Sequence, residues 1–141
     1  MQGIFNQVMV ASILTSTLIS PLAVQAAELN GSDLLGSWEG EMKGFYGKSY
    51  SKGEPVKIII KNSNGKAFEG HTIYNTGSNN KTRSVIINGF VFPGGEALAT
   101  NINGYFDMKL LPSGNLHVIF RDAVADQGPI SLYGVFRKDT D

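Results

Sequence analysis

Apolar and polar residues alternate along most of the chain after residue 26, and short clusters of Gly, Asn and Pro interrupt the alternation. A period of two is typical of β-strands that have one buried and one solvated face. This part of the chain shows no helical period of useful length. The pattern predicts eight strands, at residues 36–43, 55–62, 67–76, 82–92, 97–101, 104–111, 115–122 and 131–138.

Short connections join the predicted strands. The pairs Asn64-Gly65 and Asn103-Gly104 suit two-residue hairpin turns, because Asn and Gly tolerate a positive φ. Strands joined in this way pair as antiparallel neighbours, and closing the sheet removes its exposed edges. We therefore predict an all-β domain, an eight-stranded antiparallel up-and-down β-barrel. An open sandwich is the alternative.

One parity of each predicted strand is apolar and is expected to face the barrel interior. It includes Trp38, Met42, Val56, Ile58, Ile60, Val85, Ile87, Val91, Phe106, Met108, Leu110, Leu116, Val118, Phe120, Leu132 and Phe136. The opposite parity carries charges and is expected to face solvent. Glycine recurs on the inner parity, at Gly40, Gly44, Gly70, Gly89 and Gly134. These glycines either allow strands to bend and pack closely or leave an interior cavity.

The first 26 residues contain no Lys, Arg, Asp or Glu, and most of residues 8–24 are apolar. The sequence Val24-Gln25-Ala26-Ala27 has the small residues that a signal-peptidase site requires. We predict a signal peptide at 1–26, cut after Ala26, followed by an exported (periplasmic or secreted) barrel domain at 27–141. No membrane span is expected after cleavage. Residues 1–7 lack the basic side chain that is usual in a signal peptide, and a retained anchor is the alternative.

Charge and cysteine content narrow the choice of partners. The 141-residue chain has 12 Lys and Arg against 12 Asp and Glu, so its formal net charge is +0. A neutral chain argues against nucleic acid or an anionic membrane as the main partner, since both require a basic patch. The absence of cysteine excludes disulfides, thiol catalysis and cysteine-based zinc sites.

The start and end of the predicted meander carry a family resemblance. Gly36-Ser37-Trp38 opens the first strand, and Arg137 lies near the end of the last one. This arrangement resembles the calycin superfamily of lipocalins, fatty-acid-binding proteins and avidins, and most of all the lipocalin-like domains of bacterial exported proteins. The resemblance implies that Trp38 lies across the barrel floor beside Gly36, and that Arg137 packs on the indole face. The chain departs from lipocalins in having no sequence for a helix after Lys138, and the biotin-binding polar set of avidins is not matched.

Two regions carry the candidate binding residues. Residues 45–54 are predicted as a loop rich in aromatic side chains, including Tyr46 and Tyr50. In calycins this first loop often covers the open mouth of the barrel. Thr72 and Tyr74 continue an inner parity toward one end of the barrel, where polar groups would orient a ligand. We expect Tyr46, Tyr50, Thr72 and Tyr74 to bind a small apolar or amphipathic molecule.

No motif predicts a catalytic, metal or cofactor site. His71 and His117 are the only histidines and are expected on the surface. Glu39 and Glu41 share a face, but Lys43 follows on the same face, which is typical of a solvated strand rather than a glycosidase pair. We therefore expect a binding module that is not an enzyme. The alternatives are a protein-interaction barrel, such as a periplasmic inhibitor, and an enzyme whose cavity steers a reactive lipid.

Overall fold

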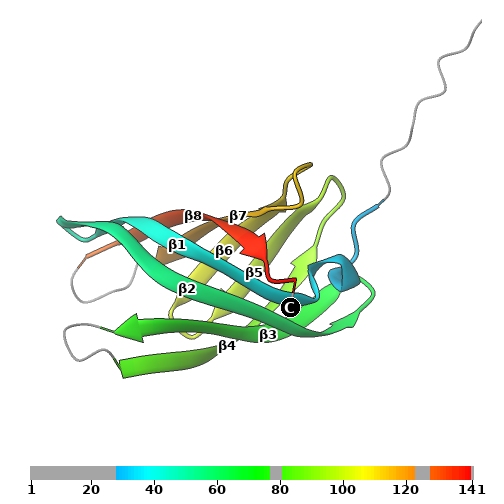
Figure 1. The fold of residues 1–141 in the computed structure, drawn as a ribbon, viewed down its shortest axis with the longest axis horizontal. Helices are drawn as coiled ribbons and strands as arrows, with labels where there is room; N and C mark the ends of the chain where they lie inside the picture. Colours follow the sequence, from blue (N-terminus) through cyan, green and yellow to red (C-terminus); the bar gives the residue numbers. More distant parts are fainter. Residues whose placement is uncertain (1–27, 77–80, 123–127, 141) are drawn as a thin grey trace, which may run out of the picture.

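The structure is a computed structural model that describes residues 28–76, 81–122 and 128–140. A short 3-10 helix, η1 (Gly31–Leu34), precedes a meander of strands that closes on itself (Figure 1). The strands are β1 (Gly36–Tyr46), β2 (Ser49–Asn64), β3 (Ala67–Thr76), β4 (Lys81–Val91), β5 (Glu96–Asn101), β6 (Gly104–Leu110), β7 (Leu116–Asp122) and β8 (Ile130–Lys138). The predicted signal peptide lies outside the described residues.

Each strand pairs with its neighbour in the sequence in antiparallel orientation, and β8 pairs with β1 to close the barrel. The prediction of an eight-stranded up-and-down barrel is therefore confirmed, and the open sandwich is excluded. The strand bounds agree closely with the sequence pattern except at one place. Residues 45–54, predicted as a loop, extend β1 and β2 into a long hairpin whose turn is Gly47 and Lys48. Gly47 has φ 56°, which a tight turn requires.

A one-residue β-bulge interrupts this hairpin and decides which side chains face inward. Met42 lies opposite Glu54, but Gly44 lies opposite Ser51, so one extra β2 residue is accommodated between these pairs. Because successive strand residues point to opposite faces, the slip exchanges the faces of the β2 residues before the bulge. Tyr50 then lies opposite Phe45, on the outer surface of the barrel.

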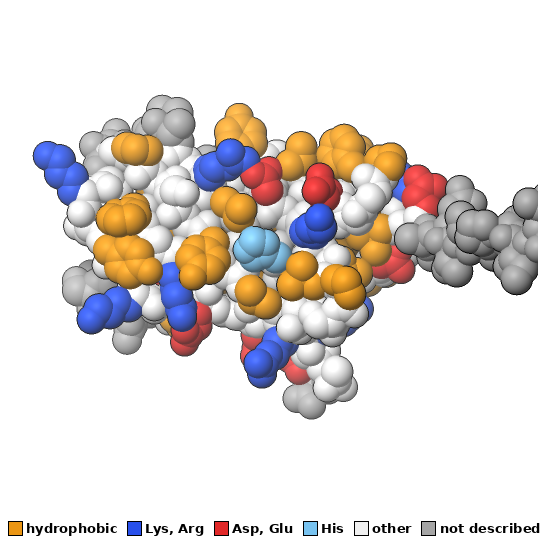
Figure 2. All heavy atoms as spheres, turned by 90° about the horizontal axis from the view of Figure 1, so that it is seen from above, with side chains coloured by type: hydrophobic (Ala, Val, Ile, Leu, Met, Phe, Trp, Pro, Cys, Tyr) orange, Lys and Arg blue, Asp and Glu red, His pale blue; other side chains and the backbone are white. Residues whose placement is uncertain are grey.

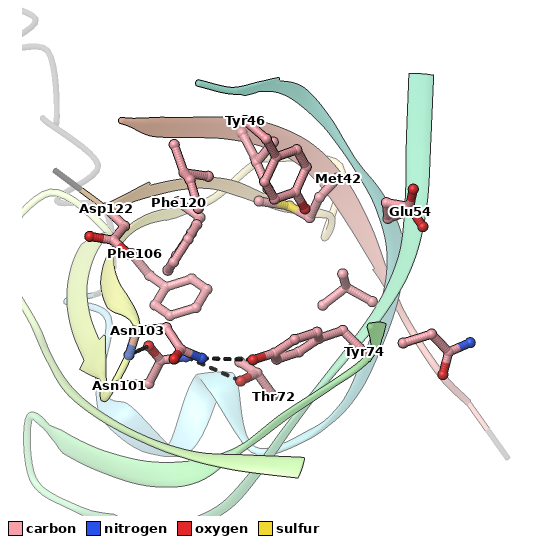
Figure 3. A pocket seen from close by; sticks show the side chains of 14 residues that line it. Met42, Tyr46, Glu54, Thr72, Tyr74, Asn101, Asn103, Phe106, Phe120 and Asp122 are labelled. Carbon is pink, nitrogen blue, oxygen red and sulfur yellow. Dashed lines mark hydrogen bonds between the residues drawn. The ribbon is translucent and has the colours of Figure 1, made fainter. Parts of the chain in front are cut away.

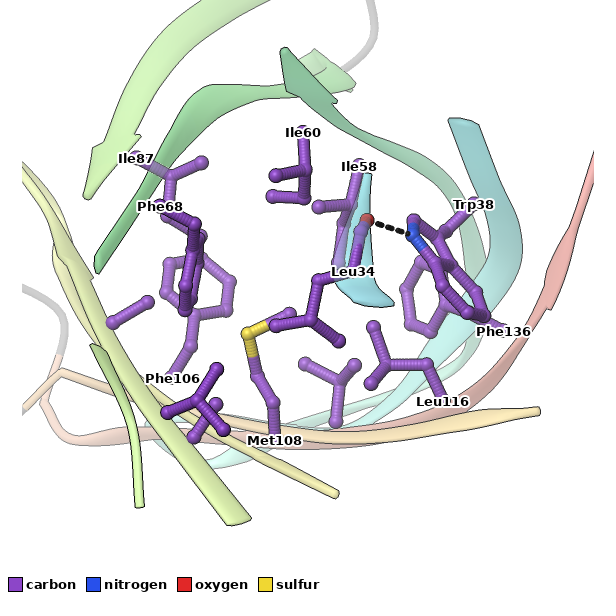
Figure 4. Packing of buried hydrophobic residues seen from close by; sticks show 14 of the residues in the cluster. Leu34, Trp38, Ile58, Ile60, Phe68, Ile87, Phe106, Met108, Leu116 and Phe136 are labelled. Carbon is purple, nitrogen blue, oxygen red and sulfur yellow. Dashed lines mark hydrogen bonds between the residues drawn. The ribbon is translucent and has the colours of Figure 1, made fainter. Parts of the chain in front are cut away.

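The barrel is closed and densely packed at the end that η1 covers (Figure 4). Trp38 is 1% exposed, and its indole Nε1 donates a hydrogen bond to the Leu34 carbonyl over 2.8 Å. The Leu34 side chain is itself fully buried. Asn30 and Asp33 form a capping box that holds the helix in place. The helix therefore plugs the barrel with an apolar side chain and gives the buried indole N–H an acceptor.

The cation next to Trp38 is a lysine. Lys138 lies opposite Trp38 in the β1–β8 pairing, and its Nζ is 5.3 Å from the indole centroid. Arg137 lies opposite Glu39 and is exposed. The expectation that Arg137 packs on the indole is therefore corrected. The physical reason is the strand period: Phe136 points inward, so residue 137 points outward and residue 138 returns to the inner parity.

The inner glycines allow close packing of neighbouring strands. A Cβ at Gly70 would overlap the Ile59 carbonyl oxygen, and a Cβ at Gly89 would overlap the Phe68 ring. Both positions lie in the closed half of the barrel, where Phe68 is 3% exposed. Of the two interpretations of these glycines, the structure therefore favours strand packing over a gap in the core.

The outer face mixes charged and apolar side chains (Figure 2). Ion pairs such as Lys57–Glu39, with 2.7 Å between Nζ and Oε1, cross between neighbouring strands. The hydrogen bond from Lys57 to Glu39 raises the lysine pKa, and the nearby Asp139 adds to the effect. Within the described ranges, no helix is long and apolar enough to cross a membrane.

Candidate functional site

A cavity of about 220 Å³ opens at the end of the barrel opposite η1 (Figure 3). This end, which we call the mouth, is where β1, β3, β5 and β7 finish and where β2, β4, β6 and β8 begin. The lining residues therefore come from the ends of several strands. They are of three kinds: apolar side chains, uncharged polar side chains, and rim residues that include two carboxylates and a phenol.

Apolar side chains form most of the cavity wall. They are Met42, Val56, Phe106, Phe120, Ile130 and Leu132. Phe106 and Phe120 lie directly opposite each other on β6 and β7, and their ring centroids are 4.8 Å apart with an interplanar angle of 49°. Gly104 makes room for this pair, because a Cβ there would come within 2.9 Å of the Phe120 ring. The wall thus offers aromatic surface to an apolar group.

Polar side chains from β3, from the end of β5 and from the β5–β6 turn form another part of the cavity wall. Asn103 Nδ2 donates a 2.6 Å hydrogen bond to the Tyr74 hydroxyl, and Asn101 Nδ2 lies 3.4 Å from Thr72 Oγ1 (Figure 3). Thr72 is 1% exposed, and its hydroxyl donates to the Val85 carbonyl over 3.3 Å. These bonds make a polar bridge across the interior between β3 and the β5–β6 turn.

The β5–β6 turn is built to hold this bridge. Asn101 Oδ1 accepts hydrogen bonds from the backbone N–H groups of Asn103 and Gly104, at 2.8 and 3.0 Å. Such side-chain to backbone bonds fix the turn and with it the direction of both asparagine side chains. From the sequence, Asn103 is predicted only as a turn residue, and Asn101 is not predicted as a site residue. The available signal was parity, since Ala97 and Ala99 face inward and residue 101 is the next inner position.

Carboxylates and a phenol lie at the rim of the cavity. Glu54 and Asp122 are the charged residues that line it, together with Tyr46 and Asn75. Burial raises the pKa of the Tyr46 phenol, and the neighbouring Glu54 carboxylate and Tyr74 add to the rise. The phenol therefore keeps its proton and can donate a hydrogen bond. The described lining contains two carboxylates and no Lys or Arg, while Lys81 and Arg83 lie at the start of β4 at the same end of the barrel.

The structure brings together three of the four predicted binding residues. Tyr46, Thr72 and Tyr74 all line the cavity. Tyr50 is separated from them by the β1–β2 bulge: it is 55% exposed on the outer surface, where its ring meets Phe45 edge-on at 5.1 Å. Tyr50 is therefore removed from the candidate site.

The predicted floor residues Gly36 and Trp38 lie at the closed end of the barrel, away from the cavity. The histidines also lie outside the cavity lining, on β3 and β7. In the described part of the chain, no cluster of three or more His, Asp or Glu side chains is placed to hold a metal ion.

Fold and site together define a closed, eight-stranded antiparallel barrel with a small amphipathic cavity at one end. In comparisons with known proteins, the sequence matches no protein-family model and no curated protein.

Proposed function

We propose that this barrel is a binding module for one small amphipathic molecule. The observation that carries the proposal is the mouth cavity, which is lined by an aromatic pair and by a hydrogen-bonded polar bridge. Ligand sites are typically apolar cavities with a few placed polar groups. The polar lining groups Asn103 and Tyr74 are bonded to each other, which supports binding rather than acid–base catalysis.

The cavity volume limits the size of the ligand. At about 220 Å³ it exceeds the ~150 Å³ of an apolar cavity that holds benzene. It is smaller than the roughly 300–1,000 Å³ of sites for drug-sized ligands. A molecule with a single ring and a short polar substituent fits this range. A long acyl chain does not.

The two carboxylates in the cavity lining set the preferred head group. Glu54 and Asp122 are carboxylates at the rim, and the Tyr46 phenol stays protonated beside them. A negative ligand would approach two like charges, whereas a positive one would be attracted to them. We propose that the ligand is neutral or cationic, that its ring contacts Phe106 and Phe120, and that its polar group reaches Tyr74.

We further propose an exported, lipocalin-like protein. The uncharged, largely apolar N-terminal segment supports export, and the closed barrel with Trp38 at its base supports the resemblance. In this arrangement the closed end stabilises the fold and the mouth binds the ligand.

A matched set of single-ring probes tests the proposal. Benzyl alcohol, benzylamine and benzoate have similar size and differ in charge at pH 7. Titrations followed by ¹⁵N chemical shifts should move the amides of Thr72, Tyr74 and Asn103 with the alcohol and the amine. Benzoate should bind at least about threefold more weakly than benzylamine, because it faces two carboxylates at short range.

Val56→Phe is the control variant, because a phenyl group at this position would fill the cavity from its β2 side. It should abolish the shifts caused by all three probes while leaving the remaining spectrum folded. Native mass spectrometry of the protein from its natural source should show a small bound mass that is lost on denaturation. The absence of both probe binding and a bound mass would contradict the proposal.

A further inference from the structure

We propose that the free edge of β4 docks an extended, acidic peptide strand from another protein. The first half of β4 has a neighbouring strand on one side only. β4 pairs with β3 over residues 81–90, but it pairs with β5 only over residues 88–91. Within the described residues, the segment 81–87 therefore has an edge beyond the end of β5, at the mouth of the barrel (Figure 1).

The hydrogen-bond pattern identifies the backbone groups on this edge. The Val91 N–H donates to the Lys66 carbonyl on the β3 side, over 2.9 Å, and the Phe92 N–H donates to the Glu96 carbonyl on the β5 side, over 2.7 Å. The backbone N–H and C=O groups of successive strand residues point to alternate neighbouring strands, so those of even-numbered β4 residues point to the β5 side. Thr82, Ser84 and Ile86 thus direct their N–H and C=O groups toward the open edge.

The local structure keeps this edge open. β5 ends at Asn101, where the asparagine side chain fixes the turn into β6 by bonding two backbone N–H groups. β5 therefore cannot extend along β4. The side chains of Asn101 and Asn103 bond to β3 residues inside the barrel, and among the described residues positions 81–84 and 86 of β4 are exposed. An added strand would continue the line of β5 past its turn.

The side chains beside the edge indicate the chemistry of the added strand. On the outer surface, Ile86 is 58% exposed, and Phe90 and Leu98, 61% and 50% exposed, form a directly opposed pair further along β4 and β5. On the inner parity, Arg83 is exposed and has no ion pair within the described residues. A partner strand with apolar residues on its outer face would contact the exposed apolar side chains. A carboxylate on its other face, opposite Arg83, would pair with the guanidinium.

Charge favours a foreign strand over a second copy of this chain. A twofold pairing centred on Ser84 would satisfy the backbone groups of both copies. It would also make the two copies of Arg83 diagonal neighbours on one face of the strand pair, where their like charges repel. Basic residues on an edge are a common protection against self-pairing. An acidic strand would instead make an attractive contact with Arg83.

Amide hydrogen exchange and a designed peptide test the proposal. In the free protein, the amides of Thr82, Ser84 and Ile86 should exchange fast, while those of Arg83 and Val85 should be protected. The probe is an acetylated, amidated octapeptide of alternating Val and Glu, and the control is the same peptide with Lys in place of Glu. The acidic peptide should slow exchange at the three even positions, and the basic one should not.

Ser84→Pro and Ser84→Ala form the matched pair of variants. Proline removes the N–H that faces the open edge without removing a bond to β3, whereas alanine keeps it. Ser84→Pro should weaken binding of the acidic peptide by at least about tenfold, since it removes a backbone bond and blocks close approach. Ser84→Ala should bind like the wild type, and Arg83→Gln should bind about threefold more weakly because it loses the charge pair.

Three results would overturn the proposal. The first is uniform protection of residues 82–86 in the free protein, and the second is equal binding by the Pro and Ala variants. The third is a dimer in sedimentation experiments that Ser84→Pro converts to monomer, which would identify a second copy as the occupant. Because the edge lies outside the cavity lining, Val56→Phe should bind the peptide normally, so failure of the small-molecule proposal would remain distinguishable.

Discussion

The two ends of this barrel are built from the same eight strands but have opposite character. At the closed end, Leu34 and Trp38 fill the interior, and the indole N–H donates to the Leu34 carbonyl. At the mouth, Thr72, Asn101 and Asn103 place amides and hydroxyls inside, next to a cavity. Packed apolar cores stabilise a fold, whereas buried polar groups with unfilled space are typical of binding sites. We infer that stability and recognition are divided between the ends.

The largest loss of folding stability is expected from a substitution at the closed end. Trp38→Ala should lower the free energy of unfolding by roughly 3–5 kcal/mol, because it removes a large buried aromatic and leaves a cavity. It also leaves the Leu34 carbonyl without its indole donor. Urea denaturation followed by circular dichroism measures the change.

Phe90→Ala is the control for Trp38→Ala, since Phe90 is 61% exposed and its loss should cost about 0.5 kcal/mol or less. Similar costs for the two variants would show that the closed end is not the stabilising core. The division between the two ends would then fail.

Replacing a valine by phenylalanine at each end tests whether the closed end is packed more tightly than the mouth. Val118 is fully buried in the closed half, so Val118→Phe should cost about 1–3 kcal/mol through overpacking. Val56 lines the cavity, so Val56→Phe should cost less than about 1 kcal/mol, because its ring can enter existing space. Equal destabilisation by the two substitutions would indicate that the mouth is packed as tightly as the floor.

The polar bridge is expected to have a smaller effect on stability than on binding. Tyr74→Phe removes the hydroxyl that accepts the 2.6 Å hydrogen bond from Asn103. Its cost should be about 0.5–1.5 kcal/mol, the usual contribution of one hydrogen bond. The substitution should also weaken the binding of benzyl alcohol more than that of toluene, which lacks a hydroxyl. Titrations of the wild type and the variant with both probes measure the two affinities. An equal loss for both probes would show that Tyr74 does not orient a polar group.

The sequence pattern predicted the strands and the closed barrel because both follow from the alternation of apolar and polar residues. It misplaced Tyr50 because a bulge of one residue reverses the faces of a strand, and only the pairing of β1 with β2 reveals it. The resemblance implied Arg137 as the cation beside Trp38, whereas the strand parity points Arg137 outward and Lys138 toward the indole. Asn101 was missed because asparagine next to a turn is easily assigned to the turn alone. Cavity volume depends on side-chain packing in three dimensions, which a linear pattern does not contain.

The smallest effect concerns the protonation of Tyr46 at the mouth. Its pKa is raised above the ordinary value of 10.0, first by burial and then by Glu54 and Tyr74. The folded state therefore holds this proton more tightly than the unfolded state, so the stabilisation is complete below pH 10.0 and is lost as pH rises through the folded pKa.

Absorbance titration of tyrosinate should show a late component that Tyr46→Phe removes and Glu54→Gln shifts to lower pH. Tyr46→Phe should also flatten the decline in stability above this pH, measured by denaturation at a series of pH values. An unchanged titration in Tyr46→Phe would mean that the phenol is solvated and that the mouth does not control its proton. The closed end has no tyrosine among its buried side chains, so an alkaline effect assigned to Tyr46 reports on the mouth.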